Sequence, residues 1–294
     1  MNIGKNNTIS ATTLIPNFVE MGDFNRIGAN VTIQAVKGAK NPKLIIGDCN
    51  IINDNVKILV GDEGVFIKDW NVIHNNIFII GERKVEIGHN GWFGQHTILD
   101  GSGGLSIGNG VRIGMYSQIW THVASGEQLE GCVLYAQRGT IIHDDVWLVG
   151  SCIVGSGIVL AKRSICLINS LLTKDTIEGK VYSGSPAKVM EKINFYKKVD
   201  IADKYNMMYN WANEFANSNQ DITVERTSTE MIVITNKLSE KIIFTSIDHL
   251  DTDLDPLVTV FNMQTKTFKK KKSILEMEFY AFIYNNKARF IPIN

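Results

Sequence analysis

Aliphatic residues recur at every sixth position over most of the first two-thirds of the chain. Such a period, often with Gly after the apolar residue, is typical of a hexapeptide parallel β-helix, in which each hexad forms a short strand and a corner. Gly fits because a corner requires tight backbone conformations and close backbone approach. The clearest apolar positions are Ile87, Phe93, Leu99, Ile107, Ile113, Ile119, Ile142, Leu148, Val154, Leu160, Cys166 and Leu172.

These positions fall into groups of three, which predicts a three-sided prism. Ile67, Ile87 and Ile107 each open a group and lie twenty residues apart, so each coil holds three hexads and two extra residues. The period can be followed from Ile3 to Ile177, about eight coils, well above the three or so repeats that a stable stack needs.

Composition and charge narrow the classes of function. The 30 basic and 30 acidic residues balance, so nothing overall favours binding to nucleic acid or to an anionic membrane. No apolar stretch is long enough to span a bilayer, and the polar N-terminus is unlike a signal peptide, so we expect a cytoplasmic protein. The four cysteines lack metal-ligand spacing and are expected to be free thiols.

The six-residue period breaks after Ile119, where function is expected. An excursion from Val123 to Thr140 interrupts the repeat, and His122 stands at its start. Long loops on rigid scaffolds often carry function.

Three segments resemble the hexapeptide acyltransferases, and more narrowly the maltose, galactoside and xenobiotic acetyltransferase branch. They are LSIGNGVRIGMYSQIWTH (Leu105 to His122), DDVWLVGS (Asp144 to Ser151) and VYSGSPAKVM (Val181 to Met190). The resemblance covers about residues 1–192. It implies a left-handed β-helix, an exception to the usual right-handed crossover. It also implies a homotrimer with acetyl-CoA between neighbouring prisms, a loop that reaches a neighbour's site, and a catalytic His at His122.

The chemistry agrees with this expectation. Acyl transfer from a thioester needs a base near neutral pH, which an imidazole supplies, and backbone N–H donors for the oxyanion. We therefore predict His122 as the general base. The family pattern makes Trp147 and the turn after it, with Gly150 and Ser151, candidates for contacts to the thioester or pantetheine. Lys188 matches the family's basic residue near the phosphates of acetyl-CoA, and Lys162 and Lys174 lie in the same C-terminal coils.

Residues of the preceding coil are candidates for the acceptor side. Gln95, His96, Asp100 and Trp120 are predicted to bind substrate. By the twenty-residue count Asp100 stacks below Trp120 and Ser102 below His122. Asp100 could therefore orient the imidazole or bind sugar hydroxyls, although Asp before Gly is also common in turns without a function.

The remaining histidines do not predict a metal site. His74, His89 and His143 follow apolar positions and are expected to point toward water. Some left-handed β-helices bind zinc through histidines, but their His-x4-His pair is absent, so no metal is expected.

The pattern changes after Pro186. Ser185 and Pro186 predict the start of a helical connector over 187–217, interrupted near Asp200, with a polar linker at 217–221. Residues 218–294 predict a small α+β domain of unknown role, with a capping box at Ser273 that opens a helix to about Tyr284. Strands are expected at 223–225, 231–235, 242–245, 258–261 and 289–293. The run Lys269 to Lys272 is either a solvated hairpin end or a contact for a phosphate-bearing acceptor.

These observations predict an acetyltransferase domain at 1–186 that moves acetyl from acetyl-CoA to a carbohydrate hydroxyl of a small-molecule or glycan acceptor. Two alternatives stay open: N-acetylation of an amino sugar, often nucleotide-linked, and a β-helix scaffold without catalysis. The residues do not separate O- from N-acetylation, because both use the same base.

Overall fold

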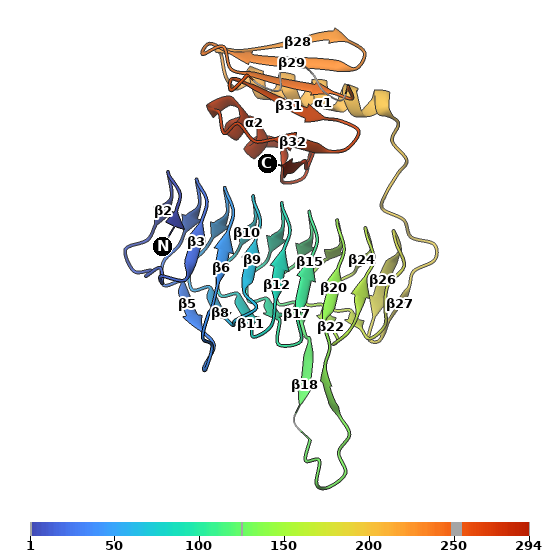
Figure 1. The fold of residues 1–294 in the computed structure, drawn as a ribbon. Helices are drawn as coiled ribbons and strands as arrows, with labels where there is room; N and C mark the ends of the chain where they lie inside the picture. The colour runs from blue at the N-terminus through green and yellow to red at the C-terminus, as the bar shows by residue number, and fades with distance from the viewer. Residues whose placement is uncertain (1, 125, 248–254, 294) are drawn as a thin grey trace. The chain divides into compact units, whose positions relative to one another are not determined.

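The computed structural model describes residues 2–124, 126–247 and 255–293. The chain divides into two compact units, with the boundary between Tyr196 and Lys197. The first unit is a stack of short parallel strands (Figure 1). The second unit is a mixed sheet with two helices. No helix among the described residues is long and apolar enough to cross a membrane.

Three sheets form the three faces of the first unit. Sheet A has the order β1 (Asn2–Ile3), β3 (Val19–Met21), β6 (Leu44–Ile46), β9 (Val65–Ile67), β12 (Val85–Ile87), β15 (Leu105–Ile107), β20 (Thr140–Ile142), β23 (Val159–Leu160). Sheet B has the order β2 (Thr8–Ile9), β4 (Arg26–Ile27), β7 (Ile51–Ile52), β10 (Val72–Ile73), β13 (Trp92–Phe93), β16 (Arg112–Ile113), β21 (Trp147–Leu148), β24 (Ile165–Cys166), β26 (Val181–Gly184), β27 (Ala187–Val189). Sheet C has the order β25 (Leu171–Leu172), β22 (Ile153–Val154), β17 (Gln118–Ile119), β14 (Ile98–Asp100), β11 (Phe78–Gly81), β8 (Lys57–Val60), β5 (Thr32–Ala35).

The core of the prism consists of the predicted six-residue anchors. Ile87 pairs in register with Ile67 on one side and Ile107 on the other, and all three are buried. Parallel strands buried on their inner side suit such β-branched residues. The predicted fold class is confirmed: a left-handed parallel β-helix of hexapeptide repeats, followed by a helix and a small α+β domain.

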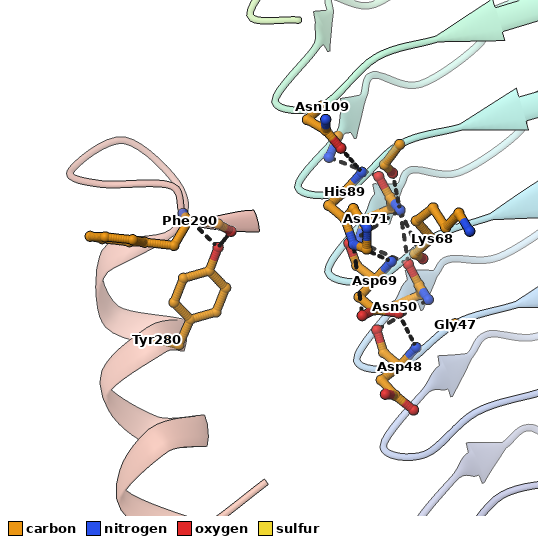
Figure 2. A network of polar contacts seen from close by, with 12 residues as sticks. Gly47, Asp48, Asn50, Lys68, Asp69, Asn71, His89, Asn109, Tyr280 and Phe290 are labelled. Atoms are coloured by element: carbon orange, nitrogen blue, oxygen red, sulfur yellow. Dashed lines mark hydrogen bonds and ion pairs between the residues drawn. The ribbon is translucent and has the colours of Figure 1, made fainter. Parts of the chain in front are cut away.

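A ladder of hydrogen bonds runs along the corner between sheets A and B. The second residue after each sheet A strand from β3 to β20 takes part in it. Its side chain accepts a hydrogen bond from the backbone N–H of the equivalent residue in the preceding coil, at 2.6 to 3.2 Å. Figure 2 shows its middle part, from Asp48 to Asn109. The ladder satisfies corner N–H groups that the strands do not reach. The accepting residues are Asp23, Asp48, Asp69, His89, Asn109 and Asp144.

This ladder accounts for the glycines that follow the anchors of sheet A. A Cβ added at Gly47 would lie 2.1 Å from Oδ1 of Asp69 in the next coil, and Gly4, Gly22, Gly88 and Gly108 are crowded in the same way by an Asp or Asn. These five glycines do not have positive φ. The predicted role of glycine is thus refined, since here it makes room for a side chain of the next coil. Lys68 stands where those five coils have glycine. In the coil that follows it, the acceptor is Nδ1 of His89 and not a carboxylate or amide oxygen.

The predicted start of the helical connector at residue 187 is wrong. Ala187–Val189 forms β27, which pairs antiparallel with β26 and leaves Ser185 and Pro186 as the turn. Gly184 makes this turn possible with φ +100°. Val189 packs against the prism core, which is why its apolar character imitated a helix face. Residues 190–200 are not helical.

The second unit is a six-stranded sheet with helices α1 (Ile201–Asn217) and α2 (Ile274–Ile283). Asp200 caps α1 and Ser273 caps α2, as their side chains accept backbone N–H groups of Asp203 and Glu276. The core is aromatic, and Phe279 of α2 contacts Phe215 of α1 and Phe244 of the sheet. The strand order is β28 (Ile222–Ser228), β29 (Met231–Asn236), β30 (Lys241–Thr245), β31 (Val258–Asn262), β32 (Thr267–Lys269), β33 (Ile291–Ile293).

Most of the predicted elements of this unit are present. The first four expected strands lie within β28 to β31, the last one overlaps β33 but begins two residues too early, and the capping box at Ser273 is confirmed. Strand β32 was not predicted, and it carries the start of the lysine run, at the end of a hairpin with β31. The polar segment 217–221 joins α1 to β28 inside the second unit, so it is not the linker between units.

Candidate active site

The excursion that breaks the repeat is an antiparallel hairpin, here called the arm (residues 122–137). Strands β18 (His122–Ala124) and β19 (Tyr135–Gln137) pair at its base, and His122 is the Cα partner of Gln137. The arm extends away from the prism between β17 and β20 (Figure 1). Its outer part carries exposed apolar side chains, Leu129, Val133, Leu134 and Tyr135.

His122 and Asp100 are joined at the root of the arm, at the corner that follows sheet C. His122 Nδ1 lies 2.8 Å from Oδ2 of Asp100. The carboxylate is fully buried, whereas the side chain of His122 is 38 % exposed. The ring therefore turns one nitrogen toward a fixed acid, and Nε2 has no hydrogen-bond partner among the described residues.

The network around Asp100 keeps it ionised. Burial by itself raises the pKa of this carboxyl, but hydrogen bonds from Ser102, Thr121 and His122 outweigh burial and lower the pKa. Oδ1 accepts from Ser102 Oγ at 2.7 Å, and Oδ2 accepts from Thr121 N at 2.7 Å and Thr121 Oγ1 at 2.9 Å. An ionised carboxylate only accepts, so the neutral imidazole carries its proton on Nδ1 and presents the Nε2 lone pair.

Trp120, a candidate for the acceptor side, lies beside this pair. Its ring centroid is 6.1 Å from that of His122, with the rings edge to face. The indole Nε1 donates to Oε1 of Gln118 at 3.1 Å, which fixes the ring against sheet C. The twenty-residue count is also supported, because Leu99 pairs in register with Ile119, next to Asp100 and Trp120.

Gln95 and His96, the other two predicted acceptor residues, lie at a different corner. They follow β13 at the corner between sheets B and C, whereas Asp100 ends β14 of sheet C and His122 begins the arm after β17 of the same sheet. The ring of His96 stacks on Tyr116 with centroids 5.1 Å apart. Within one chain, the fold does not bring Gln95 or His96 to the imidazole.

The predicted donor residues are also distributed over other parts of the prism. Trp147 points outward from β21, and Gly150 and Ser151 form the corner that follows it. The backbone N–H of Ser151 donates to Met115 O at 2.8 Å, so it is not available for a thioester. Lys162 lies at the corner between sheets A and B, and its side chain is exposed.

Lys188 lines a cavity at the last coil. It lies on β27 and pairs with Ser183 of β26. The cavity has a volume of about 330 Å³, and Lys174 also borders it. Lys162 is not among the residues that line it. Of the predicted basic residues, Lys188 is thus in a hollow that could hold a phosphate.

Three residues of the site were not predicted as site residues: Ser102, Thr121 and Gln137. Ser102 and Thr121 hydrogen-bond to Asp100, and Gln137 Nε2 donates to Ser102 O at 2.6 Å. The twenty-residue count had placed Ser102 below His122. The signal that could have revealed Ser102 and Thr121 is a hydroxyl residue two positions after Asp100 and another in the next coil, next to the residue that stacks on Asp100.

Two of the histidines expected to face water do not. The Nε2 atom of His74 is buried without a partner, the ring lies 4.8 Å from that of Trp92, and burial lowers its pKa. His89 belongs to the corner ladder. His143 is exposed. Over the described ranges, no group of three His, Cys, Asp or Glu side chains is placed to hold a metal ion.

The fold of the first unit is a β-helix of hexapeptide repeats, and part of the sequence is similar to a curated acetyltransferase. No family model matches. A probable macrolide acetyltransferase from Lysinibacillus sphaericus is 28% identical over 102 residues, 35% of this chain and 55% of that protein. The chain therefore matches about half the length of this curated relative.

Among solved structures, a maltose O-acetyltransferase from Clostridium difficile 630 is 25% identical, with a TM-score of 0.33 and coverage of 42% of this chain and 60% of that chain. The polysialic acid O-acetyltransferase OatWY is 20% identical, with a TM-score of 0.45 and coverage of 70% of this chain and 96% of that chain.

Proposed function

We propose that this protein is an acetyltransferase that moves an acetyl group from acetyl-CoA to a carbohydrate hydroxyl, with His122 as the general base. The observation that carries the proposal is the 2.8 Å contact between His122 Nδ1 and the buried Asp100 carboxylate. This contact leaves Nε2 as the proton acceptor on the exposed edge of the ring. An imidazole oriented in this way is suited to remove a proton at neutral pH.

The reaction is a direct transfer. Nε2 of His122 takes the hydroxyl proton while the acceptor oxygen attacks the thioester carbon, which gives a tetrahedral oxyanion. When the intermediate collapses, the carbon–sulfur bond breaks, and the imidazolium returns the proton to the CoA sulfur. Asp100 stabilises the imidazolium between these steps.

An acyl-enzyme intermediate does not fit the cysteines. Cys49, Cys152 and Cys166 are buried, and burial raises the pKa of Cys166 far above its usual range. Cys132 is partly exposed, but it lies in the outer part of the arm, beyond the paired strands β18 and β19. A buried thiol with a raised pKa is a poor nucleophile. A ternary complex of donor, acceptor and enzyme is therefore the proposed route.

The proposed donor site includes Trp147, Gly150 and Lys188, with the phosphates of acetyl-CoA near Lys188 and Lys174. Because these residues and His122 lie on different parts of one prism, the proposal places each active site between two copies of the chain. A homotrimer would provide three such sites. The exposed apolar residues of the arm, such as Leu129 and Val133, support a contact with a neighbouring copy.

The test is to follow acetyl transfer to a panel of sugars, amino sugars and glycans, with mass analysis of the products. His122→Ala should reduce turnover by roughly two to four orders of magnitude and leave acetyl-CoA binding intact. His143→Ala, which alters an exposed histidine elsewhere on the prism, is the matched control. Unimpaired turnover in His122→Ala would refute the assignment of the base. If acetyl-CoA does not raise the unfolding temperature of the folded wild type, the proposal that acetyl-CoA is the donor is refuted.

A further inference from the structure

The base of the arm and the Asp100–His122 pair form one closed circuit of contacts. His122 Nδ1 contacts Asp100 Oδ2 at 2.8 Å, and Asp100 Oδ1 accepts from Ser102 Oγ at 2.7 Å. Ser102 O accepts from Gln137 Nε2 at 2.6 Å. Gln137 lies opposite His122 in the hairpin, which closes the circuit.

Gln137 is the member of this circuit that belongs to the returning strand of the arm. The returning strand is attached to the prism near the site by the Gln137 side chain on Ser102 O and by the backbone of Arg138, whose N–H donates to Thr121 O at 2.9 Å and whose carbonyl accepts from Ser156 Oγ at 3.4 Å. The second attachment is backbone and does not depend on residue type. The first depends on a carboxamide of this length, so it is a property of Gln137 itself.

Ser102 connects this attachment to the acid. Its side chain is buried, and both its backbone N–H and its hydroxyl donate to Oδ1 of Asp100, at 3.1 Å and 2.7 Å. If the carbonyl of Ser102 loses its donor, its peptide plane is still held by the Gly103 N–H, which donates to Thr121 Oγ1 at 2.8 Å, but it loses the restraint on its carbonyl side. The plane can then tilt, and the Ser102 donors to Asp100 shift with it. The direction of Oδ2, and with it the plane of the His122 ring, would then be less well fixed.

We propose that Gln137 is a positioning residue, whose carboxamide fixes the Ser102 carbonyl and thereby holds the Asp100–His122 pair in its productive orientation. The inference rests on the proposed role of His122 as the base. It also gives the arm a second task, because any contact that shifts the returning strand shifts the imidazole. Binding of a partner to the arm and the orientation of the base are thus coupled through the Gln137 side chain.

The first experiment measures the imidazole directly and needs no acceptor. The full-length protein is labelled with ¹⁵N-histidine, and the His122 signals are assigned by their loss in His122→Ala. In the wild type at neutral pH we expect a protonated Nδ1 and an unprotonated Nε2. In Gln137→Met, which keeps the size of the side chain but removes its donor, the two nitrogen shifts should move toward each other as the tautomers mix.

Two further variants make the result specific. Gln128→Met makes the same change in the exposed outer part of the same arm and should leave both nitrogen shifts as in the wild type. Gln137→Glu also removes the donor and places an acceptor against Ser102 O, so it should reproduce the effect of Gln137→Met. If one Gln137 variant does not fold, the other decides the question.

Kinetics provides the second readout. Where transfer is measurable, Gln137→Met should lower kcat by about tenfold to a hundredfold through misplacement of the base, with the KM for acetyl-CoA unchanged. Nitrogen shifts and kcat in folded Gln137 variants that match those of Gln128→Met would overturn the inference, even if wild-type transfer supports the proposed function. A wild type that transfers no acetyl group would instead refute the proposed function, while the nitrogen shifts still report on the coupling.

Discussion

Asp100 and His122 come from successive coils of the prism, and a single hydrogen bond of 2.8 Å joins Oδ2 of the acid to Nδ1 of the imidazole. The coil spacing places Asp100 under Trp120, two residues before the base, and the break in the repeat takes His122 out of sheet C and into the arm. The charge of Asp100 then decides which ring nitrogen is available.

Replacing this charge should impair catalysis. In Asp100→Asn an amide NH₂ can take the place of a carboxylate oxygen. This NH₂ donates to Nδ1 of His122 and does not accept its proton, so the Nδ1–H tautomer is no longer favoured. We expect turnover to fall by roughly two to four orders of magnitude, because the wrong tautomer presents no base to the acceptor. Asp144→Asn is the matched control, since Asn109 already performs the same ladder role as Asp144. Equal rates in the two variants would contradict the role of Asp100.

The same residue should contribute a pH-dependent part of the stability. The pKa of Asp100 is lower in the folded protein than its ordinary value. Its stabilising contribution is therefore complete above the unfolded value of about 4 and is lost as the pH falls below it toward the folded pKa. The difference in unfolding free energy between wild type and Asp100→Asn should shrink in that acidic range. Tryptophan fluorescence is a suitable probe, since four of the five tryptophans lie in residues 1–196.

Substitution of a ladder glycine should destabilise the β-helix. In Gly47→Ala the new Cβ meets Asp69 Oδ1 at 2.1 Å and the carbonyl carbon of Lys68 at 2.9 Å, so the coil must shift. We expect a loss of about 1–3 kcal/mol in unfolding free energy, typical of overpacking. Gly155→Ala is the control, because its Cβ would have its nearest contact at an ordinary 3.4 Å. A Gly47→Ala protein as stable as Gly155→Ala would contradict the steric argument.

Lysines at the last coil should bind the phosphates of the donor. The double variant Lys174→Gln and Lys188→Gln removes the two lysines that line the 330 Å³ cavity. Its Kd for acetyl-CoA should rise by about tenfold, the loss of one or two charge-assisted contacts. Lys57→Gln, a change on sheet C, should leave the Kd unchanged. Calorimetric titration at two salt concentrations measures the Kd and its dependence on salt for the wild type and both variants. An unchanged Kd in the double variant would place the phosphates elsewhere.

Oligomeric state can be tested through the arm. We expect light scattering of the wild type to give three times the 32.8 kDa mass of the chain. Leu129→Asp combined with Val133→Asp introduces charges at two exposed apolar positions of the arm and should dissociate the trimer. Leu238→Asp, at an exposed apolar residue of the second unit, should not. A monomeric wild type would contradict the shared site as well as the trimer.

The sequence was most informative where one period governs many residues. The anchors from Ile3 to Leu172 define the strands, the three faces and the coil length together. An error in placing one strand is therefore corrected by the next anchor of the period. The coil count also placed Asp100 near His122 without any structure. The apolar residues after Pro186 lack this redundancy, and Val189 was read as part of a helix although it packs on the prism.

Other features depend on contacts that one-dimensional patterns do not encode. Gln95 and His96 precede Asp100 by only a few residues, yet a flat face of the prism separates them from the imidazole. The N–H of Ser151 is used by Met115 O of the preceding coil. Gln137 reaches Ser102 across 35 residues, and this contact depends on the register of the hairpin.

The ladder at the corner between sheets A and B links the choice of residue in one coil to the choice in the next. Gly at the first corner position leaves room for an Asp or Asn oxygen of the following coil and for the backbone of that coil. Lys68 with His89, and His143 with Lys162, show that both partners change together. Related chains should therefore covary at these two positions, and a coil moved between such proteins will fit only if it carries the partner that its new neighbour requires.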